Sequence, residues 1–244
     1  MIIYGKNAVF ELLKNNPKDI REILLSEKSD ISRNDEIRDI SRNHKIKLTF
    51  VDKNSLNRIC SNQNHQGIAA KVDDFLYSST NEILEVSQEK HENLFLLILD
   101  HIEDPHNLGA IIRTADFLGV HGIVIPKDRA CEVNPTVIKV SSGAAKNIKI
   151  AMETNLSQLI DNLKKKDIWI IGADGESSQF IYSQDLKNLN IAVVIGNEGK
   201  GLQKKIKEKC DFLLSIPKIG KIDSLNASVA AGIFLYEILR QRNS

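Results

Sequence analysis

This sequence has few aromatic residues, no long apolar run and almost no excess charge of either sign. Aromatics make up 5% of the 244 residues, and the formal net charge is +1. Scarce aromatic rings argue against stacking on many nucleic-acid bases, and a nearly neutral chain does not by itself indicate a nucleic-acid partner. The apolar run Leu94–Leu99 has the length of a strand, not of a membrane span. Because the start, Met-Ile-Ile-Tyr-Gly, shows no signal peptide, we expect a cytoplasmic protein without a membrane partner.

Cysteine and clustered metal ligands are also sparse. The three cysteines, Cys60, Cys131 and Cys210, are odd in number and far apart, which favours reduced thiols over a disulfide framework. The six histidines show no zinc spacing. We therefore predict no metal site.

The sequence otherwise has the composition of a globular protein, with 42% hydrophobic and 27% charged residues. Residues 1–75 predict a small α/β domain, because strand-like runs (20–25, 47–51 and 67–72) alternate with helix-like ones (7–14 and 35–44). The polar segment 76–92 is predicted to be a linker, with a short helix at 81–86. Residues 93–244 would form the second domain.

The second domain repeats the order strand, loop, helix. Its expected strands are short and continuously apolar, at 94–99, 122–125, 168–171, 191–195 and 212–216. Helices are expected at 108–118, 135–140, 156–165, 202–209 and 224–240. Such strands are typical of a parallel sheet that is buried on both faces, and sheets of this kind bind ligands at the carboxyl ends of their strands.

Three stretches rich in glycine and small polar residues follow such strand ends, at 104–119, 194–202 and 215–232. The second has the two glycines of a phosphate-binding loop, but Leu202 stands where that loop needs lysine, and no dinucleotide fingerprint is present. Glycines here would instead let the backbone approach a neutral, planar ligand.

Together these stretches resemble the three motifs of the SpoU (TrmH-type) branch of the SPOUT RNA 2′-O-methyltransferases. The resemblance rests on Asn107, Gly109 and Arg113 in the first, on 196–199 in the second, and on 216–217, 224–226 and Ser228 in the third. It covers about 94–240. Residues 4–9 and 65–68 resemble the L30e-like substrate-binding domain of the same family, so the chain most resembles the 23S rRNA guanosine 2′-O-methyltransferase group.

The resemblance implies an α/β SPOUT catalytic domain at 93–244, with a trefoil knot that binds S-adenosylmethionine, behind an L30e-like domain at 1–75. It implies a homodimer that methylates the ribose 2′-hydroxyl of a guanosine in large-subunit rRNA. The catalytic residues it implies are Arg113, Asn107, Glu198, Ser224 and Asn226, and the cofactor-binding residues are Gly196, Ile216, Leu225 and Ala173. Lys218 and Ala227 depart from the family pattern, where an apolar residue and valine are usual.

The chemistry leaves several roles open. A methyl group on a sulfonium needs no metal, but a ribose hydroxyl is a weak nucleophile until it is positioned or deprotonated. Arg113 would either accept the proton, which a guanidinium does poorly, or stabilise the developing alkoxide. Glu198 would hold Arg113 or the amino end of the methyl donor, and Asn107 would position Arg113 or the ribose. Ser224 is a good helix N-cap, whereas Asn226 would lie inside the first turn.

Two other functions remain open at this stage. The same chemistry on tRNA is one, although residues 1–75 favour rRNA. A non-catalytic ribosome-assembly factor is the other, although the motif residues are intact. Basic residues near the motifs or in the first domain are candidates for RNA contact: Lys6, Lys127, Arg129, Lys139, Lys146, Lys200 and Lys221.

Overall fold

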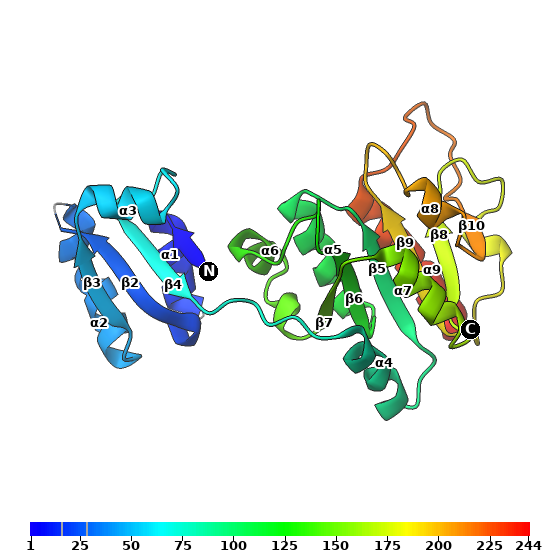
Figure 1. Ribbon diagram of the computed structural model, residues 1–244, viewed down its shortest axis with the longest axis horizontal. Coiled ribbons are helices and arrows are strands. Elements are labelled where there is room, and N and C mark those ends of the chain that lie inside the picture. Colours follow the sequence, from blue (N-terminus) through cyan, green and yellow to red (C-terminus); the bar gives the residue numbers. More distant parts are fainter. Residues whose placement is uncertain (16, 28) are drawn as a thin grey trace. The chain divides into compact units, whose positions relative to one another are not determined.

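The computed structural model describes residues 1–15, 17–27 and 29–244, and these form two compact units, Met1–Phe75 and Leu76–Ser244. Each unit is described by itself (Figure 1). Neither unit contains, among its described residues, a helix long and apolar enough to cross a membrane.

The first unit is a four-stranded sheet with helices on both faces. Its strands are β1 (Ile2–Tyr4), β2 (Ile20–Ser26), β3 (Lys47–Val51) and β4 (Ile68–Val72), in the order β1-β4-β2-β3. Its helices are α1 (Lys6–Asn15), α2 (Asp35–Asn43) and α3 (Lys53–Ile59). Helices α1 and α2 pack against one face through Val9, Leu13 and Ile37, and α3 covers part of the other through Leu56. The predicted α/β unit is present, with β1 and α3 as additions.

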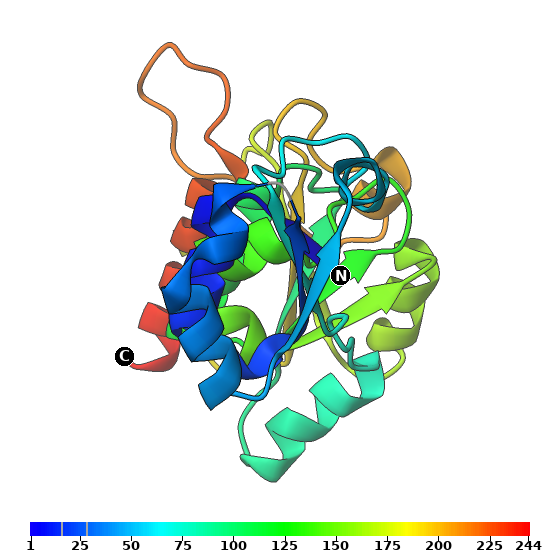
Figure 2. The same ribbon diagram turned by 90° about the vertical axis from the view of Figure 1, so that its left-hand side faces the viewer.

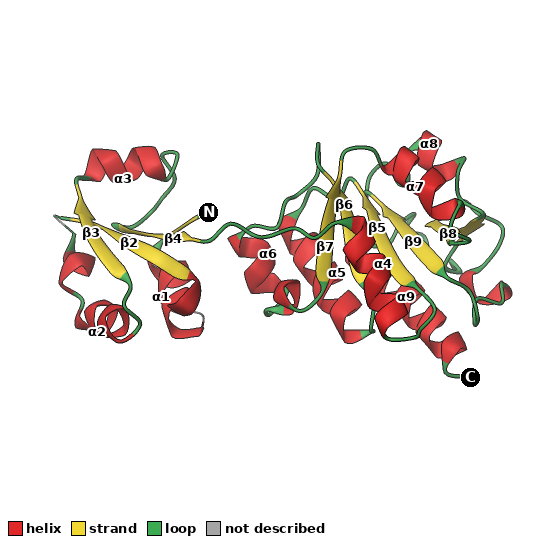
Figure 3. Ribbon diagram, turned by 60° about the horizontal axis from the view of Figure 1, so that its bottom comes forward, coloured by secondary structure: helices red, strands yellow, loops and turns green. Residues whose placement is uncertain are grey.

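The second unit is built on a six-stranded sheet in which every pair of neighbours is parallel (Figure 3). The strands are β5 (Phe95–Asp100), β6 (Gly122–Pro126), β7 (Lys149–Glu153), β8 (Trp169–Ala173), β9 (Ile191–Gly196) and β10 (Phe212–Leu214), in the order β10-β8-β9-β5-β6-β7. The predicted parallel sheet is therefore confirmed. Strand β7 was not predicted, because Lys149 and Glu153 at its ends hide a short apolar centre.

Helices cover both faces of this sheet. They are α4 (Thr80–Glu89), α5 (Pro105–Phe117), α6 (Pro135–Val140), α7 (Leu156–Lys164), α8 (Lys204–Lys207) and α9 (Ala227–Arg242). One core cluster joins α4, α7 and α8 to the even-numbered strand residues Leu96, Ile98 and Val194. Because strand side chains alternate, the neighbouring residues point to the opposite face, where α5 and α9 pack on the sheet and on each other.

The segment 76–92, which we predicted to be a linker, is part of the second unit. A capping box formed by Ser79 and Glu82 starts helix α4 at Thr80, one residue earlier than expected, and the helix continues to Glu89, three residues beyond the predicted end. Ile83 is fully buried, and its side chain occupies the space where a Cβ on Gly122 of β6 would lie. The sequence did not indicate this burial, because most residues of α4 are polar, including those on its outer face.

Replacing Ile83 with alanine should therefore destabilise the second unit by about 2–5 kcal/mol, the range for removing a buried branched side chain. Chemical denaturation of the purified chain measures the loss. Leu76→Ala is the matched control in the same segment, because Leu76 is 89% exposed and should change the unfolding free energy little. Equal stability of the two variants would show that α4 does not carry the core contacts described here.

Candidate active site

The carboxyl ends of β8, β9 and β10 lie side by side at one edge of the sheet. Ala173 is paired with Leu214, and Gly172 with Val194, so the strands end at nearly the same level. Gly196 ends β9, and half-buried Ile216 follows β10. The segment between β10 and α9 then projects from this end of the sheet (Figure 2). Three of the four predicted cofactor-binding residues thus lie at the expected edge, and Leu225 lies on the projecting segment, 46% exposed.

The loop that follows β9 folds tightly back on itself. The backbone N–H groups of Asn197 and Gly201 donate to each other's carbonyls at 3.2 and 2.8 Å. A Cβ at Gly196 would lie 2.3 Å from the carbonyl carbon of Gly201 and 2.5 Å from the amide nitrogen of Leu202. Gly196 is therefore required by the close approach of its own loop, and this fold of the loop sets where Glu198 stands.

A buried carboxylate holds one end of this loop, and the carbonyl of the next residue holds the other. Asp100, at the end of β5, is 1% exposed, and its Oδ2 accepts the backbone N–H of Gln203 at 2.7 Å. Its Oδ1 lies 2.6 Å from Nδ1 of His101, and the carbonyl of His101 accepts from Nδ2 of Asn197 at 3.0 Å. Sequence reasoning missed Asp100, although an acidic residue closing an otherwise apolar run is a visible signal.

The three motifs meet at Glu198. Its Oε1 accepts from Nδ2 of Asn107 and from the backbone N–H of Ala227, each at 3.0 Å, and also from Nδ2 of Asn226. The Asn226 amide additionally donates to Oδ1 of Asn107 at 2.9 Å. Asn107 is 8% exposed, whereas Glu198 is exposed. Asn107, Glu198 and Asn226, called the motif cluster below, thus bring the start of α5, the β9 loop and the start of α9 together.

Helix α9 begins later than predicted, which reverses the expected roles of two residues. The helix starts at Ala227, so Asn226 is its N-cap, and its Oδ1 accepts from the backbone N–H groups of Ser228 (2.9 Å) and Val229 (3.4 Å). Ser224, which we expected to cap the helix, lies exposed in the preceding segment. The prediction that Asn226 is not a cap was wrong.

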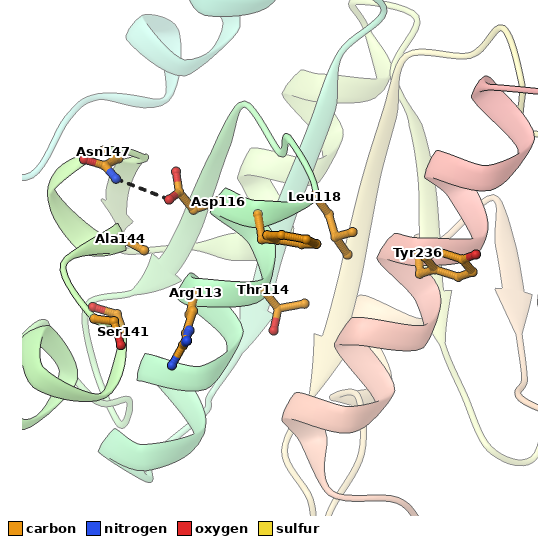
Figure 4. A pocket seen from close by; sticks show the side chains of 10 residues that line it. Arg113, Thr114, Asp116, Leu118, Ser141, Ala144, Asn147 and Tyr236 are labelled. Atoms are coloured by element: carbon orange, nitrogen blue, oxygen red, sulfur yellow. Dashed lines mark hydrogen bonds between the residues drawn. The ribbon is translucent and has the colours of Figure 1, made fainter.

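Arg113 lies apart from the motif cluster. It is exposed on α5 and lines a cavity of about 530 Å³ between α5 and α9, where Tyr236 stands across from it (Figure 4). Ser141 and Asn147 border the same cavity, and Asn147 donates to Asp116 at 3.3 Å. Among the described residues, no hydrogen bond or ion pair joins Arg113 to Glu198 or Asn107. The expectation that Glu198 holds Arg113 is therefore not met within one chain.

The cysteines offer no nucleophile to this site. Burial raises the pKa of the Cys210 thiol to about 12 and that of Cys131 to about 11, and it also raises the pKa of Cys60. A raised pKa keeps a thiol protonated near neutral pH, which argues against covalent catalysis through Cys131 or Cys210. In the described part of the chain, no group of three or more metal-ligating side chains comes together either.

A tight glycine loop and the side-chain amides of Asn107 and Asn226 thus meet at the carboxyl edge of a parallel sheet, which is where sheets of this kind bind their ligands. Comparison with known proteins identifies the class of this protein. Residues 94–236 match the model of the SpoU rRNA Methylase family, and residues 2–78 match the model named RNA 2′-O ribose methyltransferase substrate binding. The chain therefore belongs to the SpoU rRNA methylase family.

Two of the following three similar proteins match nearly the whole chain, and the third matches about two thirds of it. The 23S rRNA (guanosine-2′-O-)-methyltransferase RlmB of Neisseria meningitidis serogroup B is 41% identical over 242 residues, which cover 98% of this chain and 95% of the relative. The SpoU methyltransferase AviRb of Streptomyces viridochromogenes, crystallised with S-adenosylmethionine, has the same fold, with a TM-score of 0.69 and 23% identity over 100% of this chain and 90% of that one. The TrmH/SpoU tRNA modifying enzyme of A. aeolicus, at a TM-score of 0.57 and 28% identity, covers 67% of this chain and 82% of that one.

Proposed function

We propose that this protein transfers the methyl group of S-adenosylmethionine to the ribose 2′-hydroxyl of a guanosine in 23S rRNA, in the cytoplasm. The match of both family models and the near-full-length relationship to RlmB support this assignment. The observation that carries it is the motif cluster, in which Glu198 joins side chains from all three motifs.

The residues at the sheet edge fit S-adenosylmethionine. The loops after β8, β9 and β10 offer backbone groups and the apolar side chains of Ile216 and Leu225, which suit an adenine ring. S-adenosylmethionine has a positively charged sulfonium, which would supply an activated methyl group. The negative charge of the Glu198 carboxylate complements this positive charge. We propose cofactor contacts from Gly196, Ile216, Leu225 and Ala173. The trefoil knot remains a prediction of the family resemblance.

The roles of the polar residues follow from their contacts. Asn107 and Asn226 are held by Glu198, so their amides are oriented before substrate arrives, which favours a positioning role beside the ribose. We assign Ser224, on the exposed segment, to the same role. Arg113 would act as stabiliser of the developing alkoxide, since a guanidinium does not give up its proton in proteins.

We also propose that the enzyme is a homodimer through an apolar face of α5 and α9. Four large side chains are exposed on these two helices: Phe117 (87%), Tyr236 (59%), Val229 (49%) and Ile233 (37%). Residues 229–236 of α9 are apolar on every side of the helix, and a helical stretch of this kind is normally covered on all sides. Arg113 lines the cavity at this face, so a second copy that packs on the face would lie against Arg113.

Changing Phe117 and Tyr236 together to aspartate should therefore convert the dimer to a folded monomer, because both side chains are exposed in the single chain. Analytical ultracentrifugation measures the result against the 27.4 kDa chain mass. Leu76→Asp, at an exposed apolar position outside α5 and α9, is the control and should remain dimeric. A wild-type protein that sediments as a monomer would contradict the proposal.

The alternatives make different predictions about the RNA. The tRNA-modifying relative covers 67% of this chain, whereas this chain also matches a substrate-binding model over residues 2–78, which favours rRNA. Mapping of 2′-O-methyl groups on rRNA and tRNA from cells with and without the gene tests the choice. We expect the loss of one ribose methylation in 23S rRNA. Loss of a tRNA methylation would favour the alternative, and no change would favour a non-catalytic assembly factor.

A further inference from the structure

The β9 loop and the first turn of α8 form a rigid platform next to the motif cluster. Backbone hydrogen bonds between Asn197 and Gly201 close the loop. The buried carboxylate of Asp100 accepts the backbone N–H of Gln203. Helix α8 begins at the next residue, Lys204. The backbone of these residues is therefore held in place by the fold, and so are the points from which their side chains extend.

Three lysines extend from this platform, and carboxylates neutralise them little or not at all. Lys200, Lys204 and Lys205, called the basic rim below, are all exposed. In the described part of the chain Lys200 and Lys205 have no ion pair, and the single partner of Lys204 is Glu208 at 4.0 Å. Lys200 is two residues from Glu198, so the basic rim starts at the motif cluster itself.

Three other lysines, Lys164, Lys207 and Lys209, are neutralised by carboxylates. Lys207 lies 2.8 Å from Asp174 and 3.3 Å from Glu176, and its hydrogen bond to Asp174 raises its pKa. Lys164 lies 2.6 Å from Asp211, and Lys209 is paired with Asp161. The chain carries only one excess positive charge, so a local group of unpaired lysines is not a consequence of general basicity. The contrast sets the basic rim apart from these three neighbouring lysines.

We infer that the basic rim binds phosphates of the RNA strand that carries the target ribose. The inference rests on the proposed function, because it needs the ribose at the motif cluster. Phosphates flank every ribose, and lysines at the mouth of the site would meet them as point charges without reading the base. The basic rim therefore contributes affinity and strand placement, while the motif cluster acts on the ribose.

The test compares two double variants in binding to a 23S rRNA transcript between about 0.05 and 0.5 M salt. Each phosphate contact on a single strand contributes about 0.7 to the slope of log affinity against log salt, so Lys200→Gln with Lys205→Gln should reduce the slope by about 1.4. If the variant and the wild type bind equally at a 1 M reference, the variant should therefore bind about 25-fold more weakly than the wild type at 0.1 M. Lys164→Gln with Lys209→Gln removes two paired lysines and should leave the slope unchanged.

Calorimetry with S-adenosylmethionine separates the possible failures. Unchanged cofactor affinity together with the reduced slope supports the inference. A slope equal to that of the control pair overturns it, and so does a loss of cofactor affinity, since the lysines would then act through the loop. A wild-type protein that binds neither cofactor nor rRNA would instead refute the proposed function.

Discussion

Alanine in place of Arg113 is expected to reduce the rate of methyl transfer by about 10²–10³-fold, the cost of removing one preorganised group that stabilises developing negative charge. Cofactor affinity and stability should not change, because Arg113 is exposed and makes no bond to the motif cluster. Single-turnover transfer of labelled methyl groups to 23S rRNA measures the rate. Arg240→Ala is the control, since it removes an exposed arginine that is paired with Glu237.

Lysine at position 113 separates two roles of the guanidinium. A lysine keeps the charge but loses the planar, two-pronged donor arrangement. We expect Arg113→Lys to recover only a small part of the activity if the arginine clamps two oxygens. Near-normal turnover of Arg113→Lys would show that charge alone suffices, and near-normal turnover of Arg113→Ala would remove Arg113 from catalysis.

Alanine in place of Gly196 is expected to abolish measurable cofactor binding. Its Cβ would lie 2.3 Å from the Gly201 carbonyl carbon, a backbone atom that cannot move without opening the loop. Opening the loop would displace Glu198 and with it the motif cluster. Overpacking of this kind typically costs about 1–3 kcal/mol, so the variant should fold while its site is distorted. Calorimetry with S-adenosylmethionine measures the binding.

The matched control for this prediction is Gly199→Ala, three residues away in the same loop. A Cβ on Gly199 would meet its nearest atom, Oδ1 of Asn197, at 3.7 Å, which is ordinary van der Waals contact. This variant should bind the cofactor about as well as the wild type. Equal binding by both variants would mean that the close approach at Gly196 does not shape the cofactor site.

Much of the fold of the second unit was predictable because its strands are apolar on both faces. The runs at β5, β6, β8 and β9 are nearly uniform in the sequence and correspond to buried strands. The apolar pattern of the sequence is weaker where an element is short or is buried on one side only. For that reason β7 and the full length of α4 were not predicted. Tertiary packing, not local propensity, decides such elements.

The motif residues could be named from the sequence, but their contacts could not. Asn226 changed from a residue inside the helix to its N-cap because α9 starts at Ala227, a shift of three residues that the sequence does not specify. The distance between Arg113 and the motif cluster depends on which face of α5 each residue occupies within the packed unit. Asp100 matters through burial, which only the folded chain reveals.

The most direct test of the account is nucleoside analysis of 23S rRNA after reaction with the purified protein and labelled S-adenosylmethionine. The rRNA should come from cells that lack the gene, so that the target is unmethylated. Digestion to nucleosides should recover the label in 2′-O-methylguanosine, and a Glu198→Ala variant should transfer far less. Label in a base-methylated nucleoside, or no transfer by a protein that binds the rRNA, would contradict the claim that these three strand ends hold a methyl donor beside a ribose hydroxyl.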